Sequence, residues 1–272
     1  MSTLNDSKTM GSLANKLLGY VNTATVHDAN FDIAVAMIKN YKKLRNMSIQ
    51  EIADLCYVSK ASITRFCHFM GFDNFREFSS YLQQDFKISA DYTLQFQAML
   101  QSDQQMALSV YRDDLISNIY ATVAPENVKV IAELVELIHD CNRVAYFSHH
   151  FLWDIGRHFE GKMMLMGRYV EQFLDYSTQL ECARSLGPND LAIICSVGGS
   201  YPSRYSVIWN AIETSGCKIL AITQNKSSPH WNCVSHFLYC GNSNKNDIGK
   251  YSALMATDLL VIQYMRKYGD IK

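Results

Sequence analysis

The sequence predicts two domains, an all-helical N-terminal domain followed by a C-terminal α/β domain built on a parallel sheet. At 272 residues the chain is long enough for two hydrophobic cores. Apolar residues recur at helical spacing through the first third of the chain, whereas short apolar strands alternate with amphipathic helices beyond residue 142. Because such alternation implies right-handed crossovers between parallel strands, we expect helices on both faces of the sheet.

Composition excludes several other classes of protein. With 48% hydrophobic and 19% charged residues, the chain is not of the disordered type. No apolar run reaches the roughly 20 residues that span a bilayer, and the opening stretch is polar where a secretory signal needs an apolar core. We therefore expect no membrane partner and a cytoplasmic location. The eight cysteines include no CxxC pair, so buried reduced thiols are expected, with no metal and no cofactor.

The first domain is predicted over residues 1–87. Two amphipathic helices fill its first forty residues. Ser48 and Glu51 have the spacing of a capping box, in which two side chains satisfy the unpaired amides at a helix start. The next helix should begin after Ser59 and stop before Gly71. One more helix, rich in aromatic residues, closes the domain.

Residues 88–105 are polar and weakly periodic, so they are predicted to be a linker, with a continuing helix as the alternative. The second domain is predicted over residues 106–272. We expect its helices over residues 106–122, 125–140, 153–166, 178–186 and 205–215, near residue 230, and over 250–268. Its strands are expected over residues 143–147, 169–173, 191–196, 218–223 and 236–240.

The two short helices beginning at residues 48 and 59 have the order of a helix-turn-helix. Ala53 suits the close contact between the helices, Val58 fills the turn, and Ile63 and Phe66 supply the buried face of the second helix. A compact helical pair without DNA function would need the same small and apolar residues. The side chains predicted to face DNA are short and hydrogen-bonding, cationic or small: Ser48, Gln50, Ser59, Lys60, Ala61, Ser62, Thr64 and Arg65.

A local basic patch supports this assignment although the whole chain carries a net charge of only −1. Residues 39–68 hold six Lys and Arg against two acidic residues. Lys42 and Lys43 are therefore predicted to lie beside the phosphate backbone of double-stranded DNA. The alternative is a solvated helix face with no partner.

The string from Ser48 to Phe72 resembles the helix-turn-helix of the RpiR family of regulators, whose signature reads VS-x-x-[ST]-[IV]-x-RF-C-x-x-x-GF. The resemblance implies a C-terminal SIS (sugar isomerase) domain, a flavodoxin-like α/β unit that binds phosphosugars. It also implies a homodimer or homotetramer that binds operator DNA, regulates genes of carbohydrate metabolism and responds to a sugar phosphate. Whether such a regulator activates or represses does not follow from the resemblance.

Residues 196–200 are predicted to contact the effector because they follow an apolar strand, where open α/β sheets bind ligands. Glycine amides can approach an anion there, although a Gly-Gly-Ser turn is often only a turn. The loop resembles the S-x-S-G-x-T phosphate loop of the family: Ser196 and Gly199 match, Gly198 replaces the second serine, and Ser200 precedes Tyr201 where the last pair is expected.

Further candidate effector residues follow other strands. The family's G-x-G-x-S turn after the first strand is replaced by Ser148-His149-His150-Phe151-Leu152, whose bulky side chains hinder close phosphate approach. Ser148, His149 and His150 are predicted anion contacts, with an ordinary surface pair of histidines as the alternative. Thr223 and Ser228 lie in a segment that resembles the family's IT…SP pattern, and a plain strand end and turn would look the same.

Three functions remain open on the sequence. A sugar-phosphate-responsive regulator is predicted, and it has no catalytic residues. A regulator whose SIS domain serves only for dimerisation is the second, favoured by the altered loops. A phosphosugar isomerase is the third, since the fold hosts such enzymes, but no Glu or His stands in a motif that supplies the general base.

Overall fold

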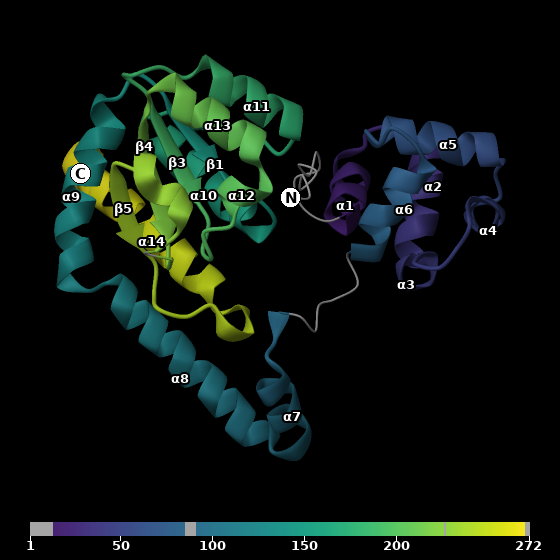
Figure 1. The fold of residues 1–272 in the computed structure, drawn as a ribbon, viewed down its shortest axis with the longest axis horizontal. Helices are drawn as coiled ribbons and strands as arrows, with labels where there is room; N and C mark the ends of the chain where they lie inside the picture. Colours follow the sequence, from purple (N-terminus) through teal and green to yellow (C-terminus); the bar gives the residue numbers. More distant parts are fainter. Residues whose placement is uncertain (1–12, 85–90, 226, 270–272) are drawn as a thin grey trace. The chain divides into compact units, whose positions relative to one another are not determined.

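The computed structural model describes residues 13–84, 91–225 and 227–269, and the chain divides into two compact units (Figure 1). Residues 11–90 belong to one unit and residues 91–272 to the other. Each unit is described by itself. Residues 1–12 and 85–87 of the predicted first domain and residues 88–90 of the predicted linker lie outside the described residues.

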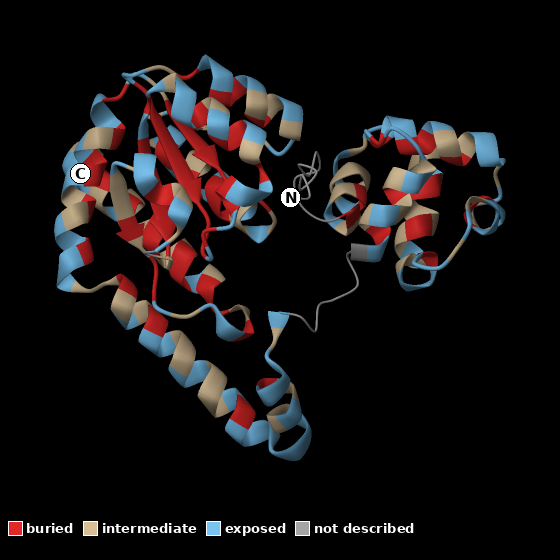
Figure 2. Cartoon of the chain, in the orientation of Figure 1, coloured by how far each residue is buried: buried red, intermediate tan, exposed pale blue. Residues whose placement is uncertain are grey.

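The N-terminal unit is all-helical, as predicted. Its helices are α1 (Leu13–Thr23), α2 (Ala29–Lys39), α3 (Tyr41–Leu44), α4 (Ile49–Leu55), α5 (Lys60–Phe69) and α6 (Phe75–Gln84). Their apolar sides meet in one core, in which Leu17, Met37, Phe66 and Phe78 are fully buried. This core holds α4 and α5 at a fixed angle through the buried Ala53, so that the outer side of α5 stays open to solvent (Figure 2).

Most of the predicted linker is helical. Helix α7 (Leu94–Ser102) occupies it and packs on α8 (Gln104–Thr122). Thr93 caps α7 by accepting a hydrogen bond from the Phe96 amide, and the buried Phe96 ring lies 6.0 Å from the ring of Tyr111, between centroids. Phe96 is the buried residue of α7. The sequence of this helix therefore lacks the repeated apolar positions from which a helix is predicted.

The C-terminal unit is an α/β sandwich of three layers. Its elements after α8 are α9 (Pro125–Asp140), β1 (Val144–Phe147), α10 (Phe151–Leu165), β2 (Glu171–Gln172), α11 (Tyr176–Ser185), β3 (Leu191–Cys195), α12 (Tyr201–Arg204), α13 (Ser206–Ser215), β4 (Lys218–Thr223), η2 (Pro229–Cys233), β5 (His236–Tyr239), η3 (Lys245–Asp247) and α14 (Gly249–Tyr268). All strands pair in parallel, in the order β2-β1-β3-β4-β5. This order is that of flavodoxin-like sheets, which confirms the predicted fold class.

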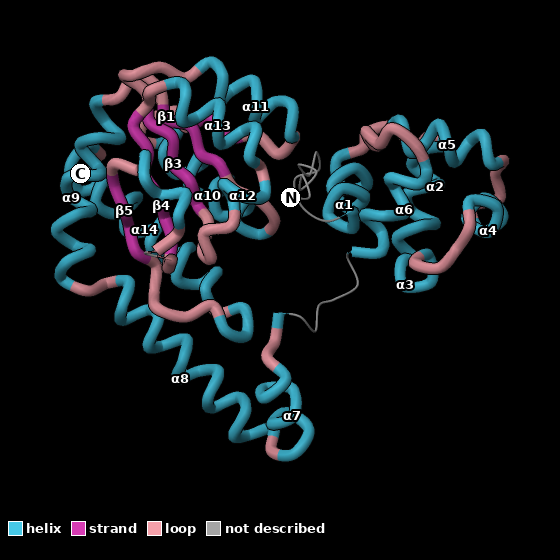
Figure 3. The backbone as a smooth tube through the Cα atoms, viewed as in Figure 1, coloured by secondary structure: helices cyan, strands magenta, loops and turns pink. Residues whose placement is uncertain are grey.

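Helices lie on both faces of this sheet (Figure 3), and a hydrophobic core forms on each face. Neighbouring strand residues point to opposite faces, so Tyr146 and Ile193 join a core with α9, α10 and α14, while Ala145 and Ile194 join a core with α11 and α13. The central strands β1 and β3 are buried at every residue. In open sheets of this kind the ligand crevice is expected at the carboxyl ends of the two strands between which the order reverses, here β1 and β3.

The sequence also led to expectations about the cysteines, a metal site and membrane-spanning helices. Six of the eight cysteines are buried and all eight are free thiols, whereas Cys233 is exposed. Among the described residues, no three His, Cys, Asp or Glu side chains gather so that they could hold a metal ion. Within the same described ranges, no helix combines the length and apolar character needed to cross a bilayer.

Candidate nucleic-acid interface and effector site

Two serine caps define the helix pair of the N-terminal unit. The hydroxyl of Ser48 accepts a hydrogen bond from the Glu51 amide at 3.3 Å, and the Glu51 carboxylate accepts one from the Ser48 amide at 2.7 Å. This reciprocal pair is the predicted capping box. Ser59 caps α5 by accepting from the Ser62 amide at 3.2 Å. The sequence signals for both helix starts are therefore confirmed.

The first turns of α5 carry a polar cluster that faces solvent. The hydroxyls of Ser59 and Ser62 are 3.0 Å apart, and Arg65 Nη2 donates to Ser62 Oγ at 3.1 Å. Lys60 and Ala61 are exposed beside them. A helix start combines amide donors with a positive dipole end, so serines and a guanidinium at this place suit phosphate and base edges. The structure thus brings together five of the predicted DNA-binding residues.

Three other predicted DNA-binding residues are engaged within the unit or lie apart from this cluster. The Thr64 hydroxyl donates to the Lys60 carbonyl at 3.2 Å, which uses its donor inside the helix. Gln50 Nε2 donates to Asp54 Oδ1 at 2.6 Å on the exposed side of α4. Ser48 is exposed but acts as a helix cap. Their contacts with DNA stay predictions.

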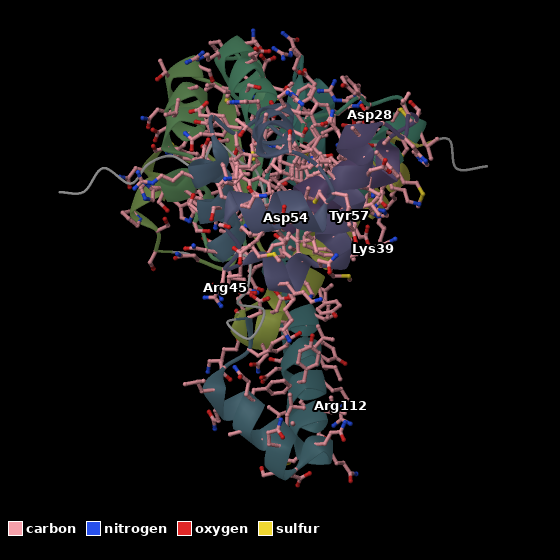
Figure 4. The ribbon with its side chains drawn as sticks, turned by 90° about the vertical axis from the view of Figure 1, so that its right-hand side faces the viewer. Asp28, Lys39, Arg45, Asp54, Tyr57 and Arg112 are labelled. Atoms are coloured by element: carbon pink, nitrogen blue, oxygen red, sulfur yellow. The ribbon has the colours of Figure 1, made fainter. Side chains whose placement is uncertain are left out.

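The two lysines predicted to lie beside the phosphate backbone are in α3. Lys42 and Lys43 are both exposed on this short helix. Figure 4 looks onto the side of the N-terminal unit that carries the α4–α5 turn, with Lys39, Arg45, Asp54 and Tyr57 labelled. Exposed cations near a helix-turn-helix attract phosphate at long range, and salt screens that attraction.

Replacing Lys42 and Lys43 together with Gln should flatten the salt dependence of DNA binding. Each phosphate neutralised contributes about −0.9 to the slope of log affinity against log salt concentration, so loss of two contacts should reduce the slope by about 1.8. Fluorescence anisotropy at several salt concentrations measures this slope. An unchanged slope would place both lysines on a solvated face with no DNA contact.

In the C-terminal unit, the loop after β3 is closed by hydrogen bonds of its own. Ser196 Oγ accepts from the Tyr201 amide at 3.1 Å, and the Gly199 amide donates to the Ser196 carbonyl at 2.9 Å. Gly199 has φ +73°, and a β-carbon there would lie 3.1 Å from Asn225 Nδ2. The loop therefore requires this glycine, and Ser196 shapes the turn; Ser200 follows as an exposed residue. Contacts from these three residues to an effector stay predictions.

The loop after β1 holds two buried polar atoms that have no hydrogen-bond partner in the described structure, Ser148 Oγ and His149 Nδ1. Both residues are at most 9% exposed. Burial, with help from the neighbouring His150 and Arg204, lowers the pKa of His149 to about 3, so its ring is neutral at physiological pH. His150 has φ +52°, a conformation that favours glycine, at the place where the family resemblance expects one.

Aromatic side chains fill the crevice between the ends of β1 and β3. Tyr201 and Tyr205 are fully buried, and their rings lie 6.0 and 5.6 Å from the His149 ring, between centroids. The Tyr201 hydroxyl donates to Gln179 Oε1 at 2.7 Å, and Gln179 Nε2 donates to the Phe173 carbonyl at 2.7 Å. A sugar phosphate would have to bind at the outer rim of this cluster or displace a ring.

The remaining predicted effector residues have structural partners. The Thr223 hydroxyl is buried, donates to the Val197 carbonyl at 3.2 Å and accepts from the Asn225 amide at 3.1 Å. Ser228 caps the short helix η2 by accepting from the His230 amide at 3.4 Å. The plain reading of strand end and turn accounts for both residues, and their contact with an effector remains untested.

Two cations near the crevice were missed in the sequence. Lys250 begins α14, and its Nζ lies 5.8 Å from the centre of the Phe151 ring, directly after the β1 loop. The backbone of the neighbouring Gly249 lies close to the β3 loop, because a β-carbon at residue 249 would lie 2.5 Å from Val197 Cγ1. Lys250 forms an ion pair with Asp247. Arg204 is close enough to His149 to affect its pKa. Only the fold brings either cation here.

Comparison with known proteins gives two similarities in sequence. Residues 21–89 match the model of the helix-turn-helix domain of the rpiR family. An uncharacterised HTH-type transcriptional regulator of Haemophilus influenzae is 22% identical over 269 residues, which cover 96% of this chain and 92% of that protein.

Solved structures supply the rest of the comparison. The Vibrio vulnificus NanR protein, in complex with ManNAc-6P, has a TM-score of 0.52 at 17% identity, with 93% of this chain and 92% of that chain covered. The sugar isomerase domain of an RpiR transcription factor from Sphaerobacter thermophilus has a TM-score of 0.48 at 20% identity, covering 60% of this chain and 92% of that one. The first likeness shows a shared fold over nearly the full chain.

Proposed function

We propose that this chain, whose residues 21–89 match the helix-turn-helix domain of the rpiR family, is a regulator of that kind with an SIS-type domain behind this module. We propose that it binds operator DNA through α5 under the control of a sugar phosphate. One observation carries the DNA half of the proposal: the outward cluster of Ser59, Ser62 and Arg65 at the start of α5. We further propose that the chain forms a homodimer or homotetramer, since two-fold symmetric regulators bind paired half-sites. We propose that it acts in the cytoplasm and controls genes of carbohydrate metabolism.

Enrichment of duplexes from a random pool by the full-length wild-type chain tests DNA binding. A regulator should enrich one sequence and bind that duplex 10³-fold or more tightly than a scrambled duplex, which is the lower end of specificity ratios, about 10³–10⁷. We refer to this product as the enriched duplex. A chain that enriches nothing would contradict the proposal.

The effector half rests on the surroundings of the β1–β3 crevice. Arg204 acts electrostatically on His149, and Lys250 lies 5.8 Å from the ring of Phe151, the residue after the β1 loop. Ser148 Oγ is a buried hydroxyl without a hydrogen-bond partner in the described structure. Phosphate monoesters suit such surroundings because charge-assisted hydrogen bonds are the strong ones. The bulky β1 loop and the buried aromatic cluster leave less room than glycine-lined loops would, so we propose either an effector other than a simple hexose 6-phosphate or weak binding. The probes should therefore include amino-sugar and disaccharide phosphates.

Replacing Lys250 with Gln should weaken binding of the sugar phosphate about tenfold or more, since a hydrogen bond to a charged group contributes about 1.5–3 kcal/mol. Calorimetry on the full chain measures it, with N-acetylmannosamine 6-phosphate, glucosamine 6-phosphate and trehalose 6-phosphate as probes. Lys162→Gln is the matched control, because that exposed lysine lies toward the opposite end of α10. Equal affinity in the two variants would remove Lys250 from the effector site.

A regulator whose SIS-type domain only dimerises is the second candidate, and the full burial of Tyr201 and Tyr205 in the crevice favours it. It predicts no binding of any phosphorylated probe while the chain still dimerises. An isomerase needs a general base at the sugar carbons. His149 is one of the titratable groups at the crevice, and its pKa of about 3 makes its ring a weak base. We therefore propose that the chain is not an enzyme.

A further inference from the structure

The turn between α4 and α5 carries a tyrosine in a backbone conformation that favours glycine. Tyr57 has φ +56° and is 96% exposed. The Tyr57 amide donates to the Asp54 carbonyl at 3.1 Å, and the Val58 amide donates to the Ala53 carbonyl at 2.9 Å. These two bonds form a Schellman motif, whose left-handed position is usually glycine because a side chain there is strained.

Two other helices of this chain end in the same motif, with glycine at the left-handed position. After α5, the Gly71 amide donates to the His68 carbonyl and the Phe72 amide to the Cys67 carbonyl, both at 2.9 Å, and Gly71 has φ +83°. After α10, Gly167 stands at the corresponding place with φ +79°. Tyr57 is therefore the exception among three matching turns of the described residues.

In the described part of the N-terminal unit, the Tyr57 ring makes no packing contact with the hydrophobic core that would offset this strain. Val58, Phe75 and Tyr81 pack on the helical core, but Tyr57 is not among the residues that do so. A bulky side chain held in a strained conformation and left in solvent is the pattern expected of a binding residue. The position of Tyr57 indicates DNA as the partner, because Tyr57 lies two residues before Ser59, which caps the helix proposed to face DNA.

We infer that Tyr57 contacts the sugar-phosphate backbone of DNA beside α5, with its hydroxyl donating to a phosphate oxygen, and this inference rests on the proposed DNA binding. Tyrosine hydroxyls are among the side-chain groups that bond DNA phosphates, and such contacts fix the position of a protein on the duplex without reading its sequence. The contact is neutral, so it adds affinity without releasing a further counterion.

Replacing Tyr57 with Gly should separate binding from folding, because the two effects have opposite signs. The affinity of the full chain for the enriched duplex should fall at least fivefold, and by the same factor for a scrambled duplex. The slope of log affinity against log salt concentration should stay that of the wild type. Amide hydrogen exchange in α4 and α5 should slow or stay equal, because the strain at the turn is relieved.

Three further variants make the result specific. Tyr57→Phe removes the hydroxyl alone and should lose most of the same affinity. Tyr57→Asn keeps a side chain that tolerates the left-handed conformation and should bind as weakly as Tyr57→Gly. Gly167→Tyr places a tyrosine in the matching turn of the other unit, where the new β-carbon has no atom within 4 Å, and should lower the thermal midpoint by a few degrees through strain alone.

Two outcomes would overturn the inference while leaving the proposed function intact. The first is wild-type affinity of Tyr57→Gly for the enriched duplex. The second is faster hydrogen exchange in α4 and α5 of that variant, which would mean that the ring stabilises the turn. If the wild-type chain enriches no duplex at all, the proposed DNA binding fails, and the role of Tyr57 fails with it.

Discussion

Replacing Arg65 with Ala should weaken binding of the enriched duplex by about 10–100-fold, since a good bidentate base contact contributes about 1–3 kcal/mol. Arg65 is exposed on α5, and its Nη2 donates to Ser62 Oγ at 3.1 Å, which holds the guanidinium over the first turns of the helix. A guanidinium already oriented by a hydroxyl loses less side-chain entropy on binding. The effect should be larger for the enriched duplex than for a scrambled one.

Arg76→Ala on α6 is the matched control, because that arginine is exposed in the same unit but lies outside the helix pair. Its affinity should stay that of the wild type. Arg65→Lys keeps the charge but not the planar fork of donors, so it should restore affinity for the scrambled duplex more than for the enriched one. A loss in Arg65→Ala that is equal for both duplexes would make Arg65 a phosphate contact without base readout.

The helix-turn-helix could be predicted from the sequence because its signals are local. Ser48 and Glu51 stand three residues apart, and both halves of their capping box form. Ser59 and Gly71 mark the start and the end of α5 by the chemistry of single residues. Patterns of this kind involve neighbours along the chain, so no knowledge of the tertiary fold is needed to interpret them.

The candidate effector site could be predicted only in part because its residues come from distant segments. The position of the β3 loop follows from strand order, and the need for Gly199 follows from its left-handed backbone. Lys250 comes within 5.8 Å of the Phe151 ring in a helix that can start against Val197 only because residue 249 is a glycine. The burial of Tyr201 depends on a hydrogen bond to Gln179, which no local pattern indicates.

The left-handed backbone conformations of two residues also could not be predicted from the sequence. Tyr57 and His150 both have positive φ, although neither is a residue that usually adopts it. Both stand next to a candidate binding site, where strain is more common than elsewhere in proteins. A glycine at either position would have indicated a tight turn, whereas a tyrosine and a histidine gave no such signal.

His149 should make the C-terminal unit sensitive to acid. Its pKa is about 3 in the folded chain, against 6.5 for an unperturbed histidine, and burial is the largest cause. Between these two values the unfolded chain binds one more proton than the folded chain, so this residue's contribution is fully present above pH 6.5 and declines as the pH falls. The free energy of unfolding should drop by about 1.4 kcal/mol per pH unit from this residue, or about 2–3 kcal/mol between pH 6.5 and 4.5.

His149→Gln should remove this part of the pH dependence, because glutamine keeps polar atoms in the crevice but does not titrate. Urea unfolding followed by tryptophan fluorescence measures it, since Trp153, Trp209 and Trp231 all lie in the C-terminal unit. Some slope should remain, because burial also lowers the pKa of His236. Parallel pH curves for the wild type and His149→Gln would show that the pKa of His149 does not change on folding, so that the folded chain would carry a positive charge on His149 below about pH 6.5.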